Sequence, residues 1–273
     1  MLKPVFQTKL IIPPAPTVSV PRPRLIEQLD FGLQHGHRLL FVTAPPGYGK
    51  TTLLSAWANG GGARFCWLSL DDSDNDAAQF WLDLASAVAQ HIPQVLDPIQ
   101  TLLQGDPLHQ LPIDLLLAVL INMLAQETAA LVLILDDYHV IHNERIHAAL
   151  IQLLARMPVV FHLTITSRSE PPLELTRLRA RNQLTEIQMD ALGFSERESA
   201  AFLNESMHLG LTAEDIALLT QRTEGWAAGL QLAALTLQAI RRRGETEEAL
   251  RDFVRSFGGG HRHVMDYLTD EVL

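Results

Sequence analysis

The segment that most constrains the fold is the stretch APPGYGKTT at positions 44–52. It follows an apolar run at positions 39–42 and precedes a pattern with apolar residues on one helical face. A strand, a glycine-containing loop and a helix in this order are the context that a phosphate-binding loop requires. Glycines let the backbone curl so that its N–H groups point at phosphate oxygens, and the helix adds its positive end. We therefore expect an α/β domain that binds phosphate at this loop.

The loop supplies most of the candidate binding residues. We expect Lys50 to reach the β- and γ-phosphates and the Thr51 hydroxyl to bind Mg²⁺. The other expected contacts come from Pro46, Gly47, Tyr48, Gly49 and Thr52. The full pattern begins with glycine, whereas this one begins with Ala44, so the match is one residue short. The alternative is a turn rich in proline and glycine that ends at a lysine.

A pair of carboxylates follows the apolar run LVLIL at positions 131–135. An unbroken run rich in branched residues is typical of a strand buried on both faces of a parallel sheet. Ligands of such sheets bind at the carboxyl ends of the strands, so we expect Asp136 and Asp137 beside the phosphate loop. Asp136 would hold Mg²⁺, and Asp137 would orient or deprotonate the attacking water. Alternatively, both residues only begin a turn.

The remaining pattern alternates strands with helices. We expect strands at 38–43, 63–70, 159–166 and 184–189, and helices at 24–33, 77–91, 113–126 and 144–157. The prolines within 92–112 predict a loop there. This alternation predicts a doubly wound parallel sheet, the three-layer architecture of a P-loop NTPase. Arg168 follows the strand at 159–166 and is either a sensor of the γ-phosphate or a plain surface charge.

From position 195 onward the strand patterns stop. Helices are expected at 196–207, 213–223, 226–241 and 246–257, the first with a capping box from Ser195 to Glu198. This predicts a small helical domain at 194–258, after an amino-terminal arm and helix at 1–36 and the α/β domain at 37–193. The segment GWAAGL at 225–230 places two glycines four positions apart, which allows a close neighbour, either a nucleotide or another helix.

The composition excludes some functions and leaves others open. The formal charge of −10 opposes nonspecific DNA binding by these 273 residues. The single cysteine, Cys66, lies in an apolar run and is expected to be a buried, inert thiol. The acidic segment at 71–76 fits a turn and helix cap better than a metal site. The apolar runs are too short to span a bilayer, and no signal peptide opens the chain, so we expect a cytoplasmic location.

Several motifs together resemble one family. They are TKL at 8–10, Arg22 and Arg24, the loop at 44–52, LDDYH at 135–139, TSR at 166–168, RLRAR at 177–181, TEGWAAGLQL at 223–232 and HRHVMDYL at 261–268. In this order they resemble the amino-terminal ATPase region of the large ATP-binding LuxR-type, MalT-like transcription regulators. These regulators are STAND signal-transduction ATPases, which are relatives of the NB-ARC proteins, and the resemblance extends over nearly all of the chain.

The resemblance implies further roles. Arg22 is similar to an arm residue near the nucleotide base, and the segment with Gly229 and Leu230 to one that contacts base and ribose. Arg168 is similar to the family's γ-phosphate sensor. Positions 259–273 resemble the start of a winged-helix domain, so we expect the chain to be cut within a longer protein. DNA binding would then belong to a carboxyl-terminal domain that is not present here.

Two functions remain in competition. In the first, the chain is a weak ATPase that binds ATP or ADP with Mg²⁺, and the full-length protein self-associates when ATP and an inducer are bound. In the second, it is a metabolic P-loop kinase or NTPase. The helical domain and the acidic pair favour the regulatory switch, and the sequence gives no sign of a pocket for a phosphate acceptor.

Overall fold

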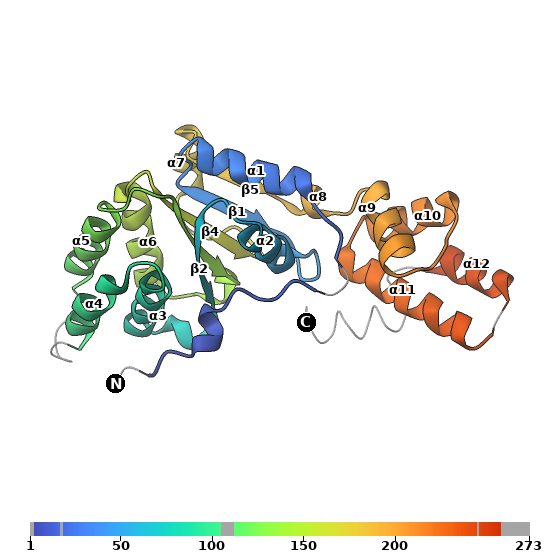
Figure 1. Cartoon of the computed structure of the whole chain (residues 1–273), viewed down its shortest axis with the longest axis horizontal. Coiled ribbons are helices and arrows are strands. Elements are labelled where there is room, and N and C mark those ends of the chain that lie inside the picture. Colours follow the sequence, from blue (N-terminus) through green and yellow to red (C-terminus); the bar gives the residue numbers. More distant parts are fainter. Residues whose placement is uncertain (1–2, 17–18, 105–111, 245, 258–273) are drawn as a thin grey trace. The chain divides into compact units, whose positions relative to one another are not determined.

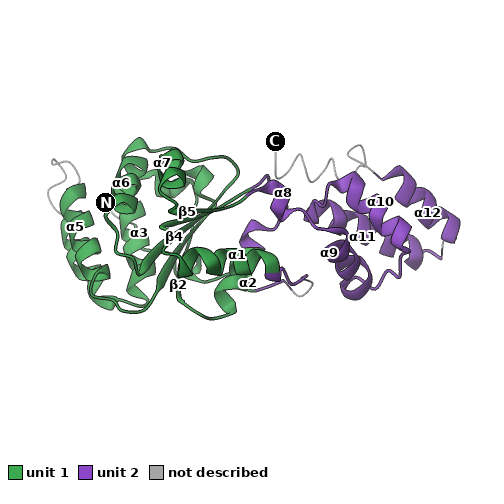
Figure 2. Ribbon diagram, turned by 90° about the horizontal axis from the view of Figure 1, so that it is seen from above, with its two compact units in different colours: residues 1–14, 24–43, 53–187 green, residues 15–23, 44–52, 188–273 purple. Residues whose placement is uncertain are grey.

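The computed structural model describes residues 3–16, 19–104, 112–244 and 246–257. It divides into two compact units, which Figure 2 colours separately. The first unit contains residues 1–14, 24–43 and 53–187, and the second contains 15–23, 44–52 and 188–273. The phosphate loop is thus grouped with the carboxyl-terminal helices. The start of a winged-helix domain expected at 259–273 lies outside the described residues.

The first unit is built on one parallel sheet. Its strands are β1 (Leu39–Thr43), β2 (Arg64–Ser69), β3 (Leu131–Asp136), β4 (Phe161–Ser167) and β5 (Leu184–Ile187). The order across the sheet is β2-β3-β4-β1-β5, and every pairing is parallel. This confirms the predicted fold class.

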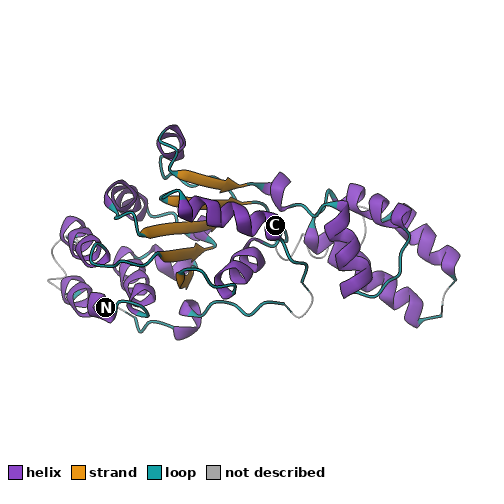
Figure 3. Cartoon of the chain, turned by 45° about the horizontal axis from the view of Figure 1, so that its top comes forward, coloured by secondary structure: helices purple, strands orange, loops and turns teal. Residues whose placement is uncertain are grey.

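Helices cover both faces of the sheet (Figures 1 and 3). The α-helices of this part of the chain are α1 (Pro23–Gln34), α2 (Lys50–Asn59), α3 (Ala77–Ala89), α4 (Leu96–Leu103), α5 (Ile113–Leu124), α6 (Glu144–Arg156) and α7 (Leu175–Ala180). Short 3-10 turns are η1 (Gln7–Leu10), η2 (Asp72–Asn75), η3 (Pro93–Val95) and η4 (Tyr138–Val140). Within the described part of the chain, no helix has the length and apolar character needed to cross a bilayer.

Alternate strand residues explain the two covered faces. In β3, Leu133 and Leu135 belong to the core formed with α3, α4, α5 and α6, whereas Val132 and Ile134 are fully buried without belonging to it. On that second face the Trp57 ring of α2 contacts the Phe65 ring of β2, with centroids 4.9 Å apart. A strand covered on both sides must be apolar at every position, which is why its sequence shows no alternation.

The loop expected at 92–112 is wrong in part, because η3 and α4 form within it. Pro98 is the third residue of α4. A proline is tolerated in the first turn of a helix, where the N–H group has no acceptor within the helix. The loop prediction gave Pro93, Pro98 and Pro107 more weight than the apolar residues between them.

The acidic segment at 71–76 forms two helix caps. Asp71 makes a capping box with Asp74 at η2, and the Asp76 side chain accepts hydrogen bonds from the N–H groups of Ala78 and Gln79 at the start of α3. The cap interpretation of this segment is therefore confirmed. Cys66 is fully buried, and burial raises the pKa of its thiol to about 12, so it is an inert thiol at neutral pH.

The second unit is helical. Its elements are α8 (Met189–Leu192), α9 (Glu196–Ala200), the π-helical segment η5 (Ala201–Ser206), α10 (Ala213–Thr223), α11 (Ala227–Arg242) and α12 (Glu247–Ser256). Leu203, Leu219, Leu230 and Leu237 are central to its core. The capping box at Ser195 is present, but the single helix expected at 196–207 changes from α to π geometry at position 201.

Candidate functional site

The phosphate loop follows β1 directly and runs into the first residue of α2. Gly47 and Gly49 both have a φ angle of 80°, which side chains with a Cβ atom rarely adopt. A Cβ added to Gly49 would meet nothing within 4 Å, so this glycine is required by its backbone angle and not by crowding. The loop therefore has the curled backbone that the sequence predicted.

Two carbonyl groups of the loop are held by the start of α11. The indole N–H of Trp226 donates to the Pro46 oxygen at 2.9 Å, and the backbone N–H of Ala228 donates to the Gly47 oxygen at 3.0 Å. The C=O and N–H groups of a trans peptide point in opposite directions. The N–H groups of Gly47 and Tyr48 are therefore directed away from α11, as donors to an anion would be. Sequence reasoning assigned no role to Trp226, although its place in the GWAAGL segment was a signal.

Lys50 is 7% exposed and folds back over the start of the loop. Its Nζ atom donates to the carbonyl oxygens of Ala44 at 2.8 Å and Pro45 at 3.2 Å. The Tyr48 ring is buried, and burial raises the pKa of its hydroxyl, with a further contribution from Glu224 and Asp190. Thr51 and Thr52 are half-buried in the first turn of α2.

The two carboxylates after β3 occupy different environments. Asp136 is 4% exposed, and one of its oxygens accepts a 2.6 Å hydrogen bond from the hydroxyl of Thr166. The side chain of Asp137 is 48% exposed, and its backbone adopts a left-handed φ of 61°. Its N–H group donates to the same Thr166 hydroxyl at 2.8 Å. Thr166 thus fixes both residues. The TSR motif contained this threonine, but sequence reasoning gave a role only to the arginine.

The strand register places these groups along one edge of the sheet. Leu135 pairs with Ile165, and Ser167 pairs with Thr43 at the end of β1. Asp136 is therefore separated from the end of β1 by β4. Arg168 follows β4 at this edge and is exposed. The prediction that the acidic pair lies at the carboxyl ends of the strands is confirmed within the first unit.

Arg22 is engaged by protein groups of the second unit. Its Nε atom donates to Glu198 at 2.7 Å, and its two other nitrogens donate to the carbonyl oxygens of Leu192, Ala191 and Gly193 at 3.0–3.3 Å. Its guanidinium also lies 4.9 Å from the ring centroid of Phe194. These contacts fasten the arm to α9 and to the segment before it. A contact between Arg22 and a base stays a prediction.

The glycines at the start of α11 are explained by protein neighbours. A Cβ on Gly225, whose φ is 70°, would come within 2.5 Å of the Phe194 backbone. A Cβ on Gly229 would come within 2.6 Å of the Trp226 ring. Leu230 is fully buried in the helical core. The close neighbours of these glycines are the Phe194 backbone and the Trp226 ring and not the backbone of another helix, and a nucleotide contact at Gly229 and Leu230 stays a prediction.

The loop residues of the second unit fit a nucleotide polyphosphate, and each unit by itself offers an oxygen donor suited to Mg²⁺. The loop offers outward-directed N–H groups and the buried ammonium of Lys50. The Thr51 hydroxyl and the Asp136 carboxylate are oxygen donors of the kind that Mg²⁺ prefers. Adding a side chain at Gly49 would fill the open space beside the loop.

Comparisons with known proteins show what the chain is similar to. No protein-family model matches the chain. It is 35% identical over 256 residues to the HTH-type transcriptional regulator MalT of Klebsiella pneumoniae subsp. pneumoniae, covering 93% of this chain and 27% of the relative. It is 34% identical over 260 residues to MalT of Vibrio cholerae, with the same two coverages. The chain thus spans about a quarter of the length of these curated relatives.

Solved structures show the fold. The Walker-type ATPase paby2304 of Pyrococcus abyssi aligns with a TM-score of 0.53 at 14% identity, covering 95% of this chain and 78% of that one. Cdc6p of Pyrobaculum aerophilum aligns with a TM-score of 0.51 at 16% identity, covering 88% of this chain and 67% of that one. The chain therefore has the P-loop ATPase fold and matches, over almost all of its length, about a quarter of a MalT-type transcriptional regulator.

Proposed function

We propose that this chain is the nucleotide-binding module of a cytoplasmic transcriptional regulator. It binds ADP or ATP with Mg²⁺ and hydrolyses ATP slowly, and the bound nucleotide controls self-association of the whole protein together with an inducer. The observation that carries the proposal is the loop itself. Its carbonyl groups are held by Trp226 and Ala228, which leaves its N–H groups directed outward as an anion-binding nest.

Each part of the loop has its own role in binding. Lys50 neutralises charge on the β- and γ-phosphates, in exchange for its present bonds to Ala44 and Pro45. Thr51 binds Mg²⁺ through its hydroxyl. The backbone from Pro46 to Gly49, continued by Thr52, surrounds the phosphates.

The carboxylates have separate roles because their environments differ. Asp136, buried and oriented by Thr166, holds the metal directly or through water. Asp137, which is half exposed, orients the attacking water. Arg168 senses the γ-phosphate. Arg22, Gly229 and Leu230 belong to the proposed base and ribose site, where Arg22 acts by holding the arm in place.

Nucleotide extraction tests the proposal most directly. The protein, purified without added nucleotide, is denatured in acid, and the supernatant is separated by ion-exchange chromatography. We expect ADP or ATP in a near-equimolar amount, or else a thermal shift on adding ADP with Mg²⁺. If no nucleotide is extracted and millimolar nucleotide causes no thermal shift, nucleotide binding is contradicted.

The regulatory part needs a separate measurement. Sedimentation of the full-length regulator with ATP and with ADP should give a larger species only with ATP and inducer. Rapid turnover with a small-molecule phosphate acceptor would instead identify a kinase and would overturn the switch.

A further inference from the structure

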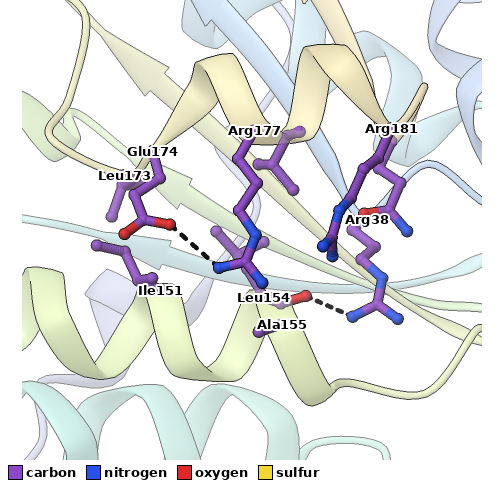
Figure 4. Close-up of a pocket in the computed structure, with 10 residues that line it drawn as sticks. Arg38, Ile151, Leu154, Ala155, Leu173, Glu174, Arg177 and Arg181 are labelled. Carbon is purple, nitrogen blue, oxygen red and sulfur yellow. Dashed lines mark hydrogen bonds and ion pairs between the residues drawn. The ribbon is translucent and has the colours of Figure 1, made fainter.

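A small pocket in the first unit is lined by three arginines (Figure 4). It has a volume of about 50 Å³ and lies between α6 and α7, beside the residues that precede β1 and β5. Arg38, Arg177 and Arg181 line it together with a single carboxylate, Glu174. The lining therefore carries an excess of positive charge within a chain whose formal charge is −10.

The three guanidinium groups differ in how far they are neutralised. Arg38 donates to the Leu154 carbonyl at 2.5 Å, in the last turn of α6, and forms no ion pair among the described residues. Arg177 forms an ion pair with Glu174 at 3.3 Å, and both side chains are about half exposed. Among the described residues, the Arg181 guanidinium has no hydrogen-bond or ion-pair partner. An ion pair on an exposed surface is weak, so Glu174 does not cancel the field of the other two groups.

The RLRAR motif contains a natural contrast. Arg179 lies between Arg177 and Arg181 but is not among the residues that line the pocket. It pairs instead with Glu186 at 2.7 Å and with Glu170 at 3.0 Å. Residues four apart share one side of a helical turn, and the middle one points elsewhere. Two arginines of the motif are therefore directed at the pocket, and the third is neutralised outside it.

The size and chemistry of the pocket indicate its ligand. A cavity needs about 10–15 Å³ to hold one water, so this one admits a group of a few heavy atoms and not a nucleotide. Guanidinium groups match the oxygens of phosphate and carboxylate with paired hydrogen bonds. Apolar side chains of α6, Ile151 and Ala155 among them, form part of the wall beside the arginines.

We propose that this pocket binds a compact oxyanion, a phosphate group, at a site separate from the phosphate loop. Arg38 and Gln183 precede the first residues of β1 and β5, so the pocket lies at the amino-terminal edge of the sheet. Asp136 and Ser167 end their strands at the opposite edge. The length of β1, five residues, separates the two edges by roughly 16 Å. The phosphate is either free phosphate or the phosphate group of a small metabolite.

The test uses inorganic phosphate and the full chain with Lys50→Ala, which removes phosphate binding at the loop. Equilibrium dialysis with radiolabelled phosphate should still detect binding to this variant. Adding Arg181→Gln should weaken that binding at least about tenfold, because a charge-assisted contact is lost. Adding Arg179→Gln instead should leave it unchanged.

The controls keep the outcome clear. The exposed Arg181 guanidinium has no hydrogen-bond or ion-pair partner among the described residues, so Arg181→Gln should melt close to the temperature of its parent. The proposal is overturned if the Lys50→Ala variant binds no phosphate. It is also overturned if that variant binds phosphate equally with and without Arg181→Gln. If a small phosphomonoester binds more tightly than free phosphate, the ligand is a phosphorylated metabolite, whereas equal or weaker binding identifies phosphate itself.

Discussion

Thr166 donates a 2.6 Å hydrogen bond to the buried carboxylate of Asp136. The same hydroxyl accepts a hydrogen bond from the backbone N–H group of Asp137, so one threonine on β4 orients both acidic residues at the end of β3. Because Thr166 is fully buried, water cannot replace either bond if the hydroxyl is removed.

Thr166→Val should therefore lower the free energy of unfolding by about 1–3 kcal/mol, because the Asp137 N–H group loses its acceptor and Asp136 loses one donor. Urea denaturation measures this change. Thr164→Val is the matched control, because the buried Thr164 hydroxyl has no hydrogen-bond partner among the described residues. An equal loss in both variants would mean that the bond to Asp136 contributes nothing to stability.

Asp136→Asn and Asp137→Asn should have different effects. The first should weaken nucleotide binding only when Mg²⁺ is present, since it removes a metal ligand. The second should spare binding and slow hydrolysis by on the order of a hundredfold or more. Calorimetry with and without Mg²⁺, together with phosphate-release rates, distinguishes them. If both variants lose binding equally, the division of roles is wrong.

Lys50→Ala should abolish most of the stabilisation by nucleotide. A ligand at about 100 times its dissociation constant stabilises a protein by about 2.7 kcal/mol. Thermal unfolding with ADP and Mg²⁺ should show this shift for the wild type and little of it for the variant. A shift of undiminished size in the variant would exclude Lys50 from the site.

Gly225→Ala should cost more stability than Gly244→Ala. Both glycines have a φ of 70°, so both substitutions carry backbone strain of about 1 kcal/mol or more. Only at Gly225 would the new Cβ also approach backbone atoms of Phe194 within 2.5 Å, whereas at Gly244 it meets nothing within 4 Å. Chemical denaturation of the pair measures the difference, and equal losses would show that the close approach is relieved without cost.

Asp83 should make stability fall as the pH rises. Burial raises its pKa to about 6, and a hydrogen bond with Asp74 adds to this effect, while Gln79 and Lys9 oppose it. A carboxyl group with a raised pKa stabilises the fold fully below about pH 4, and this contribution is lost as the pH rises through about 6. Asp83→Asn imitates the protonated form and should gain stability relative to the wild type over that range.

Comparing urea midpoints of the two proteins at about pH 4.5 and about pH 7.5 isolates this group. The comparison is needed because burial lowers the pKa values of three histidines, whose contributions are lost as the pH falls and so have the opposite sign. They are His37, His147 and His162. A constant difference between wild type and variant would contradict the assignment to Asp83.

The parallel sheet and the loop were predictable because each depends on local sequence. Continuous apolar runs such as 131–135 reflect burial on both faces, and the left-handed angles of Gly47 and Gly49 need glycine. The helix caps at Asp76 and Ser195 were likewise predictable from neighbouring residues.

The rest depended on contacts between distant residues. The bond from Trp226 to Pro46 joins positions 180 residues apart, and that from Arg22 to Glu198 joins positions 176 apart. No period or spacing in the sequence encodes such pairs. α4 was missed for a different reason, since Pro98 is harmless in a first helical turn but disruptive a turn later.

The two hydrogen bonds from α11 to the loop make this helix and the loop respond together. Pro46 and Gly47 can turn their peptide planes only by releasing Trp226 or Ala228, and α11 cannot slide or rotate without freeing the same carbonyl groups. A ligand that accepts hydrogen bonds from the loop N–H groups would thus alter the bonds between the loop and the start of α11, which begins at residue 227. The conformation of the loop and the position of α11 therefore change together.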